Sequence, residues 1–254
     1  MVIYSYSRLS TFEKCPLKFK FRYIDRLEPE IKETIESFLG HAVHQTLQWI
    51  YEEVAKGKTL KLDDVINNYV YNWNTEFRKE IRIVKEELDS EHYFNQGIKF
   101  LIDYFIKYSP FLDNTIATEK EVLIYLDPNG KYKLKGYIDR LVHNKETNIF
   151  EIHDYKTGGF LKTQEELDND KQLALYSIAI KQLFENVQDV HLIWHFLAFN
   201  QKITSKRTDE QLEALKQELM QLIDKIESTK DFPANPSMLC KWCEFRKYCE
   251  YKQN

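Results

Sequence analysis

The sequence predicts an α/β protein in which a central mixed β-sheet follows a helical N-terminal part. Apolar residues recur at helical spacing over residues 35–108, and from residue 116 they alternate as in strands. Further on, a helical segment separates two strand-like segments, and such crossovers favour a mixed sheet flanked by helices. With 254 residues and 43% hydrophobic content, the chain can bury a sizeable core within one domain.

Charge and composition exclude several classes of protein. The net charge is only −4 although 30% of the residues are charged, so any contact with nucleic acid must be a local basic patch. The chain shows no internal repeat, low-complexity run, signal peptide or apolar stretch long enough to span a membrane. We therefore expect a soluble cytoplasmic protein with no membrane partner.

The N-terminal segment, residues 1–30, is expected to form a short helix that has Ser7 as its N-cap and ends near Pro16. Residues 17–26 then interleave basic and aromatic side chains, which could follow a phosphate backbone and stack on bases. An amphipathic helix with a solvated basic face explains the same pattern equally well. The candidate DNA-binding residues are Lys18, Lys20 and Arg22.

The helical part, residues 31–110, is expected to contain helices at about 35–56, 61–79 and 90–108. His44 lies at the edge of the apolar stripe of the first helix. Gly40 precedes it by one turn and would allow another backbone or a ligand to come near. By spacing alone, a histidine in this position is more often a core residue than a metal ligand.

The sheet core, residues 111–205, is expected to include strands at about 118–126, 132–142 and 150–156. Glu119 and Glu121 share a face of the first strand; one of them could join a metal site, although exposure is the expected alternative. A polar turn folds the second and third strands into a hairpin, which brings Asp139 close to Asp154 and Lys156.

These two carboxylates and the lysine form a compact unit of chemistry. Adjacent carboxylates shift one another's pKa unless a cation lies between them, and oxygen ligands suit Mg²⁺ or Mn²⁺. The lysine supplies a positive charge that can stabilise an anion or orient a water molecule. Taken alone, the triplet Asp154-Tyr155-Lys156 is weak evidence, because most such triplets lie on the solvated surface.

The segment after the third strand is expected to be one helix over residues 164–184, in which Gln172 and Tyr176 share a face. Its first turns could overhang the carboxylates; the alternative is an exposed glutamine beside a core tyrosine. Residues 190–199 fit a buried central strand. The last part, residues 206–254, is expected to contain a helix at about 209–228 and a cysteine-containing tail.

All four cysteines fall in two short segments near the chain ends. The tail has a C-x2-C-x5-C pattern, and one further cysteine lies near the N-terminus: Cys15, Cys240, Cys243 and Cys249. Four thiolates could bind zinc, hold an iron–sulfur cluster or form two disulfides, and disulfides are the least expected in an intracellular chain. The three-plus-one pattern favours a cluster over zinc, and its ligands would clasp the two chain ends together.

Together these motifs resemble the RecB-type branch of the PD-(D/E)xK nuclease superfamily, and in particular its iron–sulfur members. These include the AddB nuclease domain and the CRISPR-associated RecB-like exonucleases. The resemblance implies a single nuclease domain over residues 1–254 with a restriction-endonuclease-like core, an N-terminal helical elaboration and a C-terminal cysteine cluster. The segments that carry it are Ser5 to Ser7, Cys15-Pro16, Gly40 to His44, Gly136 to Asp139, Asp154 to Gly158, Gln172 to Tyr176 and the cysteine tail.

The resemblance also implies the roles of individual residues. Mg²⁺ or Mn²⁺ would be bound by His44, Asp139, Asp154 and the main-chain carbonyl of Tyr155, with Lys156 as the catalytic lysine. Gln172 and Tyr176 would act near the substrate strand, and the four cysteines would ligate a structural 4Fe-4S cluster. One departure from the family pattern is that the first acid lies in Gly-x-x-Asp rather than after a proline.

The expected function is a metal-dependent deoxyribonuclease, either an exonuclease or an end-processing enzyme that acts on single-stranded DNA or free ends. DNA repair, recombination and CRISPR adaptation are the expected settings, with a helicase or an integrase-type protein as a partner. The alternative is a non-catalytic or partner-dependent DNA-binding subunit. The presence of all three residues Asp139, Asp154 and Lys156 favours the enzyme.

Overall fold

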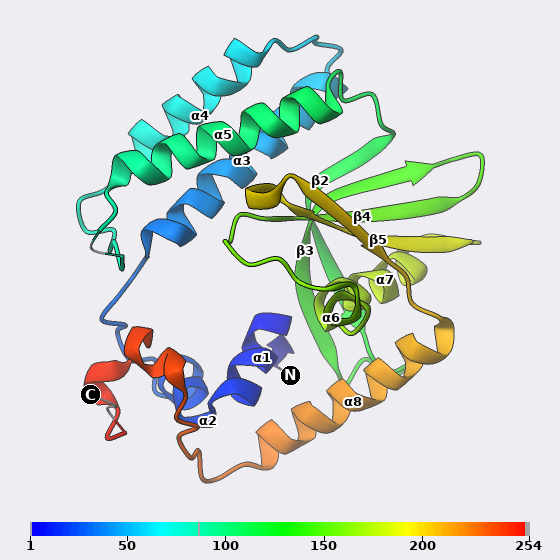
Figure 1. The fold of residues 1–254 in the computed structure, drawn as a ribbon. Coiled ribbons are helices and arrows are strands. Elements are labelled where there is room, and N and C mark those ends of the chain that lie inside the picture. Colours follow the sequence, from blue (N-terminus) through cyan, green and yellow to red (C-terminus); the bar gives the residue numbers. More distant parts are fainter. Residues whose placement is uncertain (1, 86, 252–254) are drawn as a thin grey trace. The chain divides into compact units, whose positions relative to one another are not determined.

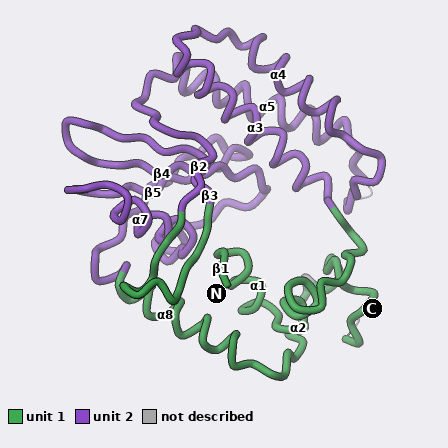
Figure 2. Tube along the Cα trace, turned by 180° about the vertical axis from the view of Figure 1, so that it is seen from behind, with its two compact units in different colours: residues 1–32, 123–136, 213–254 green, residues 33–122, 137–212 purple. Residues whose placement is uncertain are grey.

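A computed structural model describes residues 2–85 and 87–251 (Figure 1). The chain divides into two compact units, and each is built from segments that are distant in the sequence (Figure 2). Unit 1 comprises residues 1–32, 123–136 and 213–254, and unit 2 comprises residues 33–122 and 137–212.

Three long helices of unit 2 pack against one another: α3 (Ile35–Ala55), α4 (Leu62–Glu76) and α5 (Ser90–Tyr108). The N-cap side chain of Thr34 accepts a hydrogen bond from the Ser37 N–H, and that of Asp89 accepts one from the His92 N–H. The stripe predicted for α3 is confirmed, because its apolar residues are fully or almost fully buried. Its buried members include Leu39, Val43, Leu47 and Ile50.

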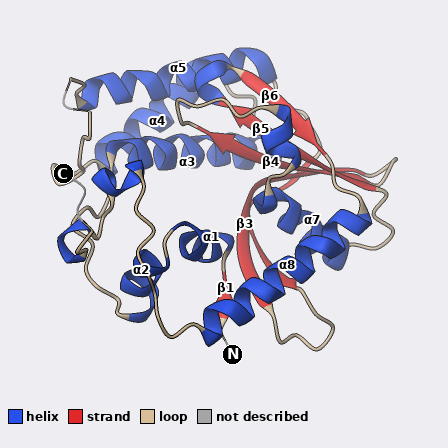
Figure 3. Ribbon diagram, turned by 60° about the horizontal axis from the view of Figure 1, so that its bottom comes forward, coloured by secondary structure: helices blue, strands red, loops and turns tan. Residues whose placement is uncertain are grey.

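The sheet is mixed, as predicted (Figure 3). Its strands include β2 (Thr115–Tyr125), β3 (Lys133–Asn144), β4 (Ile149–Lys156), β5 (Asp189–Phe196) and β6 (Gln201–Ser205). The last residues of β2 and the first residues of β3 belong to unit 1, and the other residues of these strands belong to unit 2. The pairs β3–β4 and β5–β6 are antiparallel, β4 and β5 are parallel, and β2 pairs with β3. Arg140 lies opposite His153 in the β3–β4 hairpin, so the preceding Asp139 and the following Asp154 come at the same end of the ladder.

The segment predicted as one helix is two: α6 (Gln164–Asp168) and α7 (Lys171–Leu183). The break has a local cause, since the Asp170 side chain accepts hydrogen bonds from the N–H groups of Gln172 and Leu173 and so starts a new helix. This N-cap fixes where α7 begins. Helix α7 then packs against β4 and β5.

Unit 1 brings the two ends of the chain together. Strand β1 (Ile3–Tyr4) pairs in parallel with the first residues of β3, and it is followed by α1 (Tyr6–Lys14) and α2 (Pro16–Phe19). The N-cap of α1 is Ser5, whose side chain accepts a hydrogen bond from the Arg8 N–H; the prediction of Ser7 was wrong. Helix α8 (Asp209–Ser228) runs from unit 2 into unit 1 and leads to the cysteine tail.

Main-chain hydrogen bonds tie the N-terminal segment to this tail. The N–H of Leu17 donates to the carbonyl of Pro233 at 3.2 Å, and that of Glu30 donates to the carbonyl of Glu244 at 2.7 Å. Over the residues that the structure describes, none of the helices combines the length and apolar character needed to cross a bilayer.

Candidate active site

His44 reaches the sheet because α3 comes close to the end of β4. A Cβ atom at Gly40 would lie 3.2 Å from the Thr157 hydroxyl oxygen, so glycine permits this approach. The His44 Nε2 lies 2.8 Å from the main-chain carbonyl oxygen of Tyr155. Since a carbonyl can only accept, Nε2 carries the proton, and Nδ1 faces Asp139 Oδ2 at 3.5 Å. The histidine therefore contacts two of the predicted metal ligands.

Asp139 lies in the middle of β3, at the end of its pairing with β4, and the backbone of β4 holds it there. Its Oδ2 accepts a hydrogen bond of 2.9 Å from the Tyr155 N–H. Burial and the nearby Asp154 carboxylate raise the pKa of Asp139 to about 7, although His44 and the Tyr155 N–H act in the opposite direction. A cation at this position would relieve the repulsion between the two carboxylates.

Asp154 and Lys156 form an ion pair at the end of β4. The Lys156 ammonium donates a hydrogen bond of 2.9 Å to Oδ1 of Asp154 and lies 2.7 Å from Oδ2. Burial alone would lower the pKa of Lys156, but the Asp154 carboxylate outweighs it and the pKa is raised, so the lysine is a cation. Asp154 is only 6% exposed, and the ammonium is close to both of its carboxylate oxygens.

The chemistry of the donor set is the feature that fits a metal ion. A hard cation such as Mg²⁺ prefers oxygen ligands. The surrounding donors are carboxylate oxygens, a carbonyl oxygen and an imidazole, a set that suits Mg²⁺ or Mn²⁺. The residues present therefore fit the divalent cation that the sequence predicts.

Glu119 of β2 also enters the site. The three residues His44, Glu119 and Asp139 each offer a ligand atom, and these atoms all lie within 4.8 Å of one another. Asp154 is not part of this group. The sequence left the fate of Glu119 open between the metal site and exposure, and its side chain is half-buried.

Helix α7 brings Gln172 and Tyr176 to the same region. The buried Tyr176 hydroxyl is hydrogen-bonded to the Gln172 side chain and to the backbone of Tyr137. Burial raises the pKa of Tyr176, and the nearby Asp154 and Asp139 carboxylates add to this effect. Tyr176 therefore lies within electrostatic range of Asp139 and Asp154, and Gln172 is hydrogen-bonded to it.

A buried polar network holds Tyr155, the residue between Asp154 and Lys156. Its hydroxyl accepts a hydrogen bond of 2.8 Å from the Arg140 Nε and lies 3.1 Å from the Tyr104 hydroxyl. Arg140, only 1% exposed, also bonds to Nδ1 of His153 at 2.8 Å and pairs with Asp113. The side chain of Tyr155 is thus fixed on one side of β4 while its main-chain groups contact His44 and Asp139.

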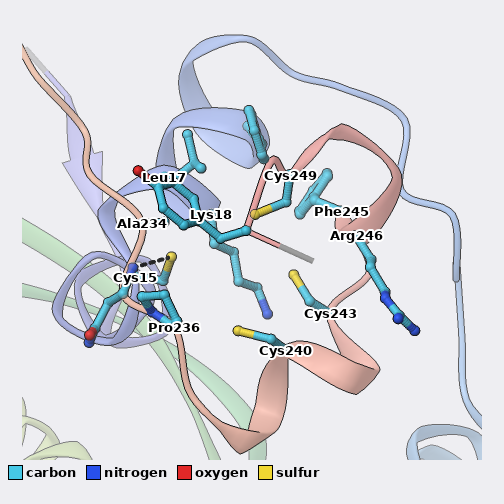
Figure 4. A pocket seen from close by; sticks show the side chains of 13 residues that line it. Cys15, Leu17, Lys18, Ala234, Pro236, Cys240, Cys243, Phe245, Arg246 and Cys249 are labelled. Carbon is cyan, nitrogen blue, oxygen red and sulfur yellow. Dashed lines mark hydrogen bonds between the residues drawn. The ribbon is translucent and has the colours of Figure 1, made fainter. Parts of the chain in front are cut away.

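The four cysteines line one cavity in unit 1 (Figure 4). All four are free thiols. Main-chain N–H groups point at two of the sulfurs: that of Asn235 lies 3.5 Å from Cys15 Sγ, and that of Ser237 lies 3.2 Å from Cys240 Sγ. Within the described chain, no three of these sulfurs lie within 4.8 Å of one another.

The candidate DNA-binding residues Lys18, Lys20 and Arg22 lie in unit 1 and all form ion pairs. Lys18 and Arg22 contact Glu244, and Lys20 contacts Asp25. Three positive charges therefore face two carboxylates. Their role in binding DNA stays a prediction.

The mixed sheet, with two carboxylates and a lysine at one end of the β3–β4 ladder, defines a restriction-endonuclease-like core. The chain belongs to the PD-(D/E)XK nuclease superfamily, whose sequence model matches residues 3–250. The family resemblance predicted from the sequence is thereby confirmed at the level of the superfamily.

Two similar proteins extend this result. Over 242 residues the chain is 28% identical to an ATP-dependent helicase/deoxyribonuclease subunit of Carboxydothermus hydrogenoformans. The match covers 85% of this chain but 22% of that protein, so the chain spans about a fifth of the length of its relative. The crystal structure of a candidate exonuclease from Eubacterium rectale has the same fold, with a TM-score of 0.54, 12% identity, and coverage of 100% of this chain and 96% of that one.

Proposed function

We propose that this chain is a metal-dependent deoxyribonuclease that hydrolyses phosphodiester bonds. The observation that carries the proposal is the joint placement of Asp139, Asp154 and Lys156 at one end of the β3–β4 ladder in a chain of the PD-(D/E)XK superfamily. The ligand atoms that His44, Glu119 and Asp139 offer within 4.8 Å of one another support it further.

Mg²⁺ or Mn²⁺ would be held by His44, Asp139, Asp154 and the carbonyl of Tyr155. When bound, such a cation lowers the pKa of a coordinated water and neutralises charge that develops on the phosphate. The Tyr155 carbonyl accepts a hydrogen bond from His44 Nε2. The histidine therefore lies directly beside this proposed carbonyl ligand.

Lys156 acts as a cation rather than as a base, because the Asp154 carboxylate beside it raises its pKa. Its ammonium can donate a hydrogen bond to the attacking water or to a phosphate oxygen, and one hydrogen bond to Asp154 fixes its direction. Gln172 and Tyr176, which are hydrogen-bonded to each other, supply further polar groups for the substrate strand.

We propose single-stranded DNA or DNA with free ends as the substrate. The names of the two similar proteins, a deoxyribonuclease subunit and a candidate exonuclease, support this class. A second support is Phe160, which lies in the loop just after Lys156 and is 68% exposed. An exposed aromatic ring can stack on an unpaired base but has no such partner in an intact duplex.

We also propose a helicase-type protein partner, because the relative in Carboxydothermus hydrogenoformans is named as a helicase/deoxyribonuclease subunit. DNA repair, recombination and CRISPR adaptation stay predictions for the pathway. The ion pairs of Lys18, Lys20 and Arg22 leave open which residues guide the DNA to the site.

For the cysteine cavity we propose a 4Fe-4S cluster. Tetrahedral zinc would hold its sulfur ligands about 4 Å apart, because Zn–S bonds are about 2.3 Å long. Among the described residues no three of the four sulfurs lie within 4.8 Å of one another, and two of them face main-chain N–H groups, a contact that stabilises cluster sulfurs. Iron and sulfide analysis of protein purified without oxygen tests this assignment; stoichiometric zinc without iron would contradict it.

The nuclease proposal is tested by release of nucleotides from end-labelled single-stranded DNA with Mg²⁺ or Mn²⁺, compared between the natural protein and Lys156→Ala. We expect the variant to lose at least about a hundredfold in rate while its DNA affinity changes little, because a charge at the reaction centre is removed. The control is Lys181→Ala. Lys181 forms its ion pair with Asp209, which is not one of the proposed metal ligands.

Two outcomes would overturn the proposal. One is full activity of Lys156→Ala. The other is a natural protein that binds DNA and releases no nucleotide with either cation, which would leave a non-catalytic role in DNA binding.

A further inference from the structure

Glu119 occupies an unusual position in β2. Its backbone is left-handed, with φ at 44°, although it is not a glycine and lies within a strand. Such a conformation is uncommon for this residue type, and it breaks the regular alternation of side chains along the strand. The direction of the Glu119 side chain therefore cannot be read from its neighbours in the sequence.

The side chain meets two residues of the candidate metal site that come from other elements. Glu119 on β2, His44 on α3 and Asp139 on β3 offer ligand atoms that all lie within 4.8 Å of one another, and all belong to unit 2. Ligands of a single octahedral Mg²⁺ are about 3 to 4 Å apart. A small inward movement would place all three around one cation.

The charged groups around Glu119 carry a net negative charge, which favours binding of a cation. Glu119 is half-buried, and no lysine or arginine among the described residues forms an ion pair with it, whereas Asp154 is paired with Lys156. In their ionised forms, the three carboxylates Glu119, Asp139 and Asp154 together with the Lys156 ammonium leave a net charge of −2. One divalent cation balances this charge.

Asp154 supplies a further carboxylate from the hairpin. It is 6% exposed, it is paired with the Lys156 ammonium, and its charge acts directly on Asp139. The carboxylates of Asp139 and Asp154 thus approach the cation position from the hairpin, and Glu119 approaches Asp139 and His44 from β2.

We infer that Glu119 is an additional carboxylate ligand of the divalent cation, supplied by β2. This inference rests on the proposed metal-dependent function and extends its ligand set beyond His44, Asp139, Asp154 and the Tyr155 carbonyl. The left-handed residue in β2 then has a function: it turns one carboxylate of the strand into the metal site.

The test is direct binding of Mn²⁺, followed by the electron paramagnetic resonance signal of the free ion, with no DNA present. We expect Glu119→Gln to weaken Mn²⁺ binding by at least about tenfold, since losing a ligand costs no less than losing a supporting contact. Glu121→Gln is the matched control, because it makes the same change two residues along β2 at an exposed position outside the ligand group. Its affinity should stay within about twofold of the natural protein.

Two further measurements keep the outcome decisive. Thermal unfolding in EDTA should show Glu119→Gln to be no less stable than the natural protein, since it removes a carboxylate that lacks a cation. If that variant does not fold, Glu119→Asp keeps the charge on a shorter side chain, and its Mn²⁺ affinity should lie below that of the natural protein and above that of Asp139→Asn.

The failure of this inference can be told from the failure of the proposed function. A natural protein that binds Mn²⁺ and cleaves DNA, with Glu119→Gln binding Mn²⁺ equally well, overturns the role of Glu119 alone. A natural protein that binds no Mn²⁺ and cleaves no DNA overturns both.

Discussion

Asp139 shows how a proposed metal ligand can destabilise the fold that holds it. Burial and the Asp154 carboxylate raise its pKa to about 7, above the ordinary value of 3.8 that applies to the unfolded chain. Between these values the unfolded chain loses the proton and the folded protein keeps it, so stability falls as the pH rises and the full penalty is present above about pH 7. We expect Asp139→Asn to be more stable than the natural protein in EDTA, by about 2 kcal/mol more at about pH 8 than at about pH 5.

Urea unfolding at the two pH values measures this difference. An asparagine can still accept the hydrogen bond from the Tyr155 N–H, so the substitution changes the charge and keeps the contact. Glu121→Gln, which removes an exposed carboxylate from β2, serves as the control for the substitution itself. An Asp139→Asn variant that is less stable at both pH values would contradict the electrostatic account.

The sequence could place Asp139, Asp154 and Lys156 together because one hairpin holds all three. The alternation of side chains and a polar turn were sufficient for that prediction. His44 could be assigned only through the family resemblance, since its spacing fits a core residue and its contact with Tyr155 is tertiary. For Glu119 the sequence left the choice between the metal site and exposure open, because a left-handed residue within a strand leaves no signal in the hydrophobic pattern.

The same contrast holds for whole elements. Long helices with regular apolar stripes, such as α3 and α5, were predicted at nearly the right boundaries. The break between α6 and α7 was missed because Asp170 can be either a helical surface residue or an N-cap. Strands β1 and β6 were also missed, since two and five residues are too few to show a period and their pairing depends on β3 and β5.

The packing of α4 against α5 depends on one glycine. A Cβ atom at Gly97 would overlap the Tyr69 hydroxyl and lie 2.9 Å from Cδ1 of Leu39, both of which belong to neighbouring helices. We expect Gly97→Ala to destabilise the protein by about 1 to 3 kcal/mol, because these buried side chains cannot move apart without cost. Chemical denaturation of the variant and the natural protein measures the change.

Gly158→Ala is the control, because a Cβ atom there meets no other atom within 4 Å among the described residues. Its stability should be close to that of the natural protein. Combining Gly97→Ala with Tyr69→Phe removes the hydroxyl and should recover part of the loss. A stable Gly97→Ala protein would show that the helices separate more easily than their packing indicates.

At the scale of the whole molecule, the two ends of the chain share one unit. Residues 1–32 and 213–254 both belong to unit 1, and the cysteine cavity is lined by Cys15 from one end and by Cys240, Cys243 and Cys249 from the other. The sequence predicted this clasp because the cysteine count and spacing leave few ways to combine four thiolates. The division into two units could not be predicted, since it depends on which distant segments pack together.

Because the proposed cluster would be ligated by cysteines from both chain ends, we expect the stability of unit 1 to depend on it. A link from Cys15 to the tail closes a loop of about 225 residues, and the chain-entropy model assigns up to about 5 kcal/mol to a cross-link of that length. We expect Cys15→Ser to lose visible cluster absorbance and to make the tail sensitive to limited proteolysis, whereas the natural protein loaded with iron resists.

Once iron is removed by a chelator, the two proteins should unfold at the same denaturant concentration, because the serine replaces the thiol without changing the main-chain hydrogen bonds between the chain ends. Equal protease resistance of the two iron-loaded proteins would show that the ends are held by those hydrogen bonds alone.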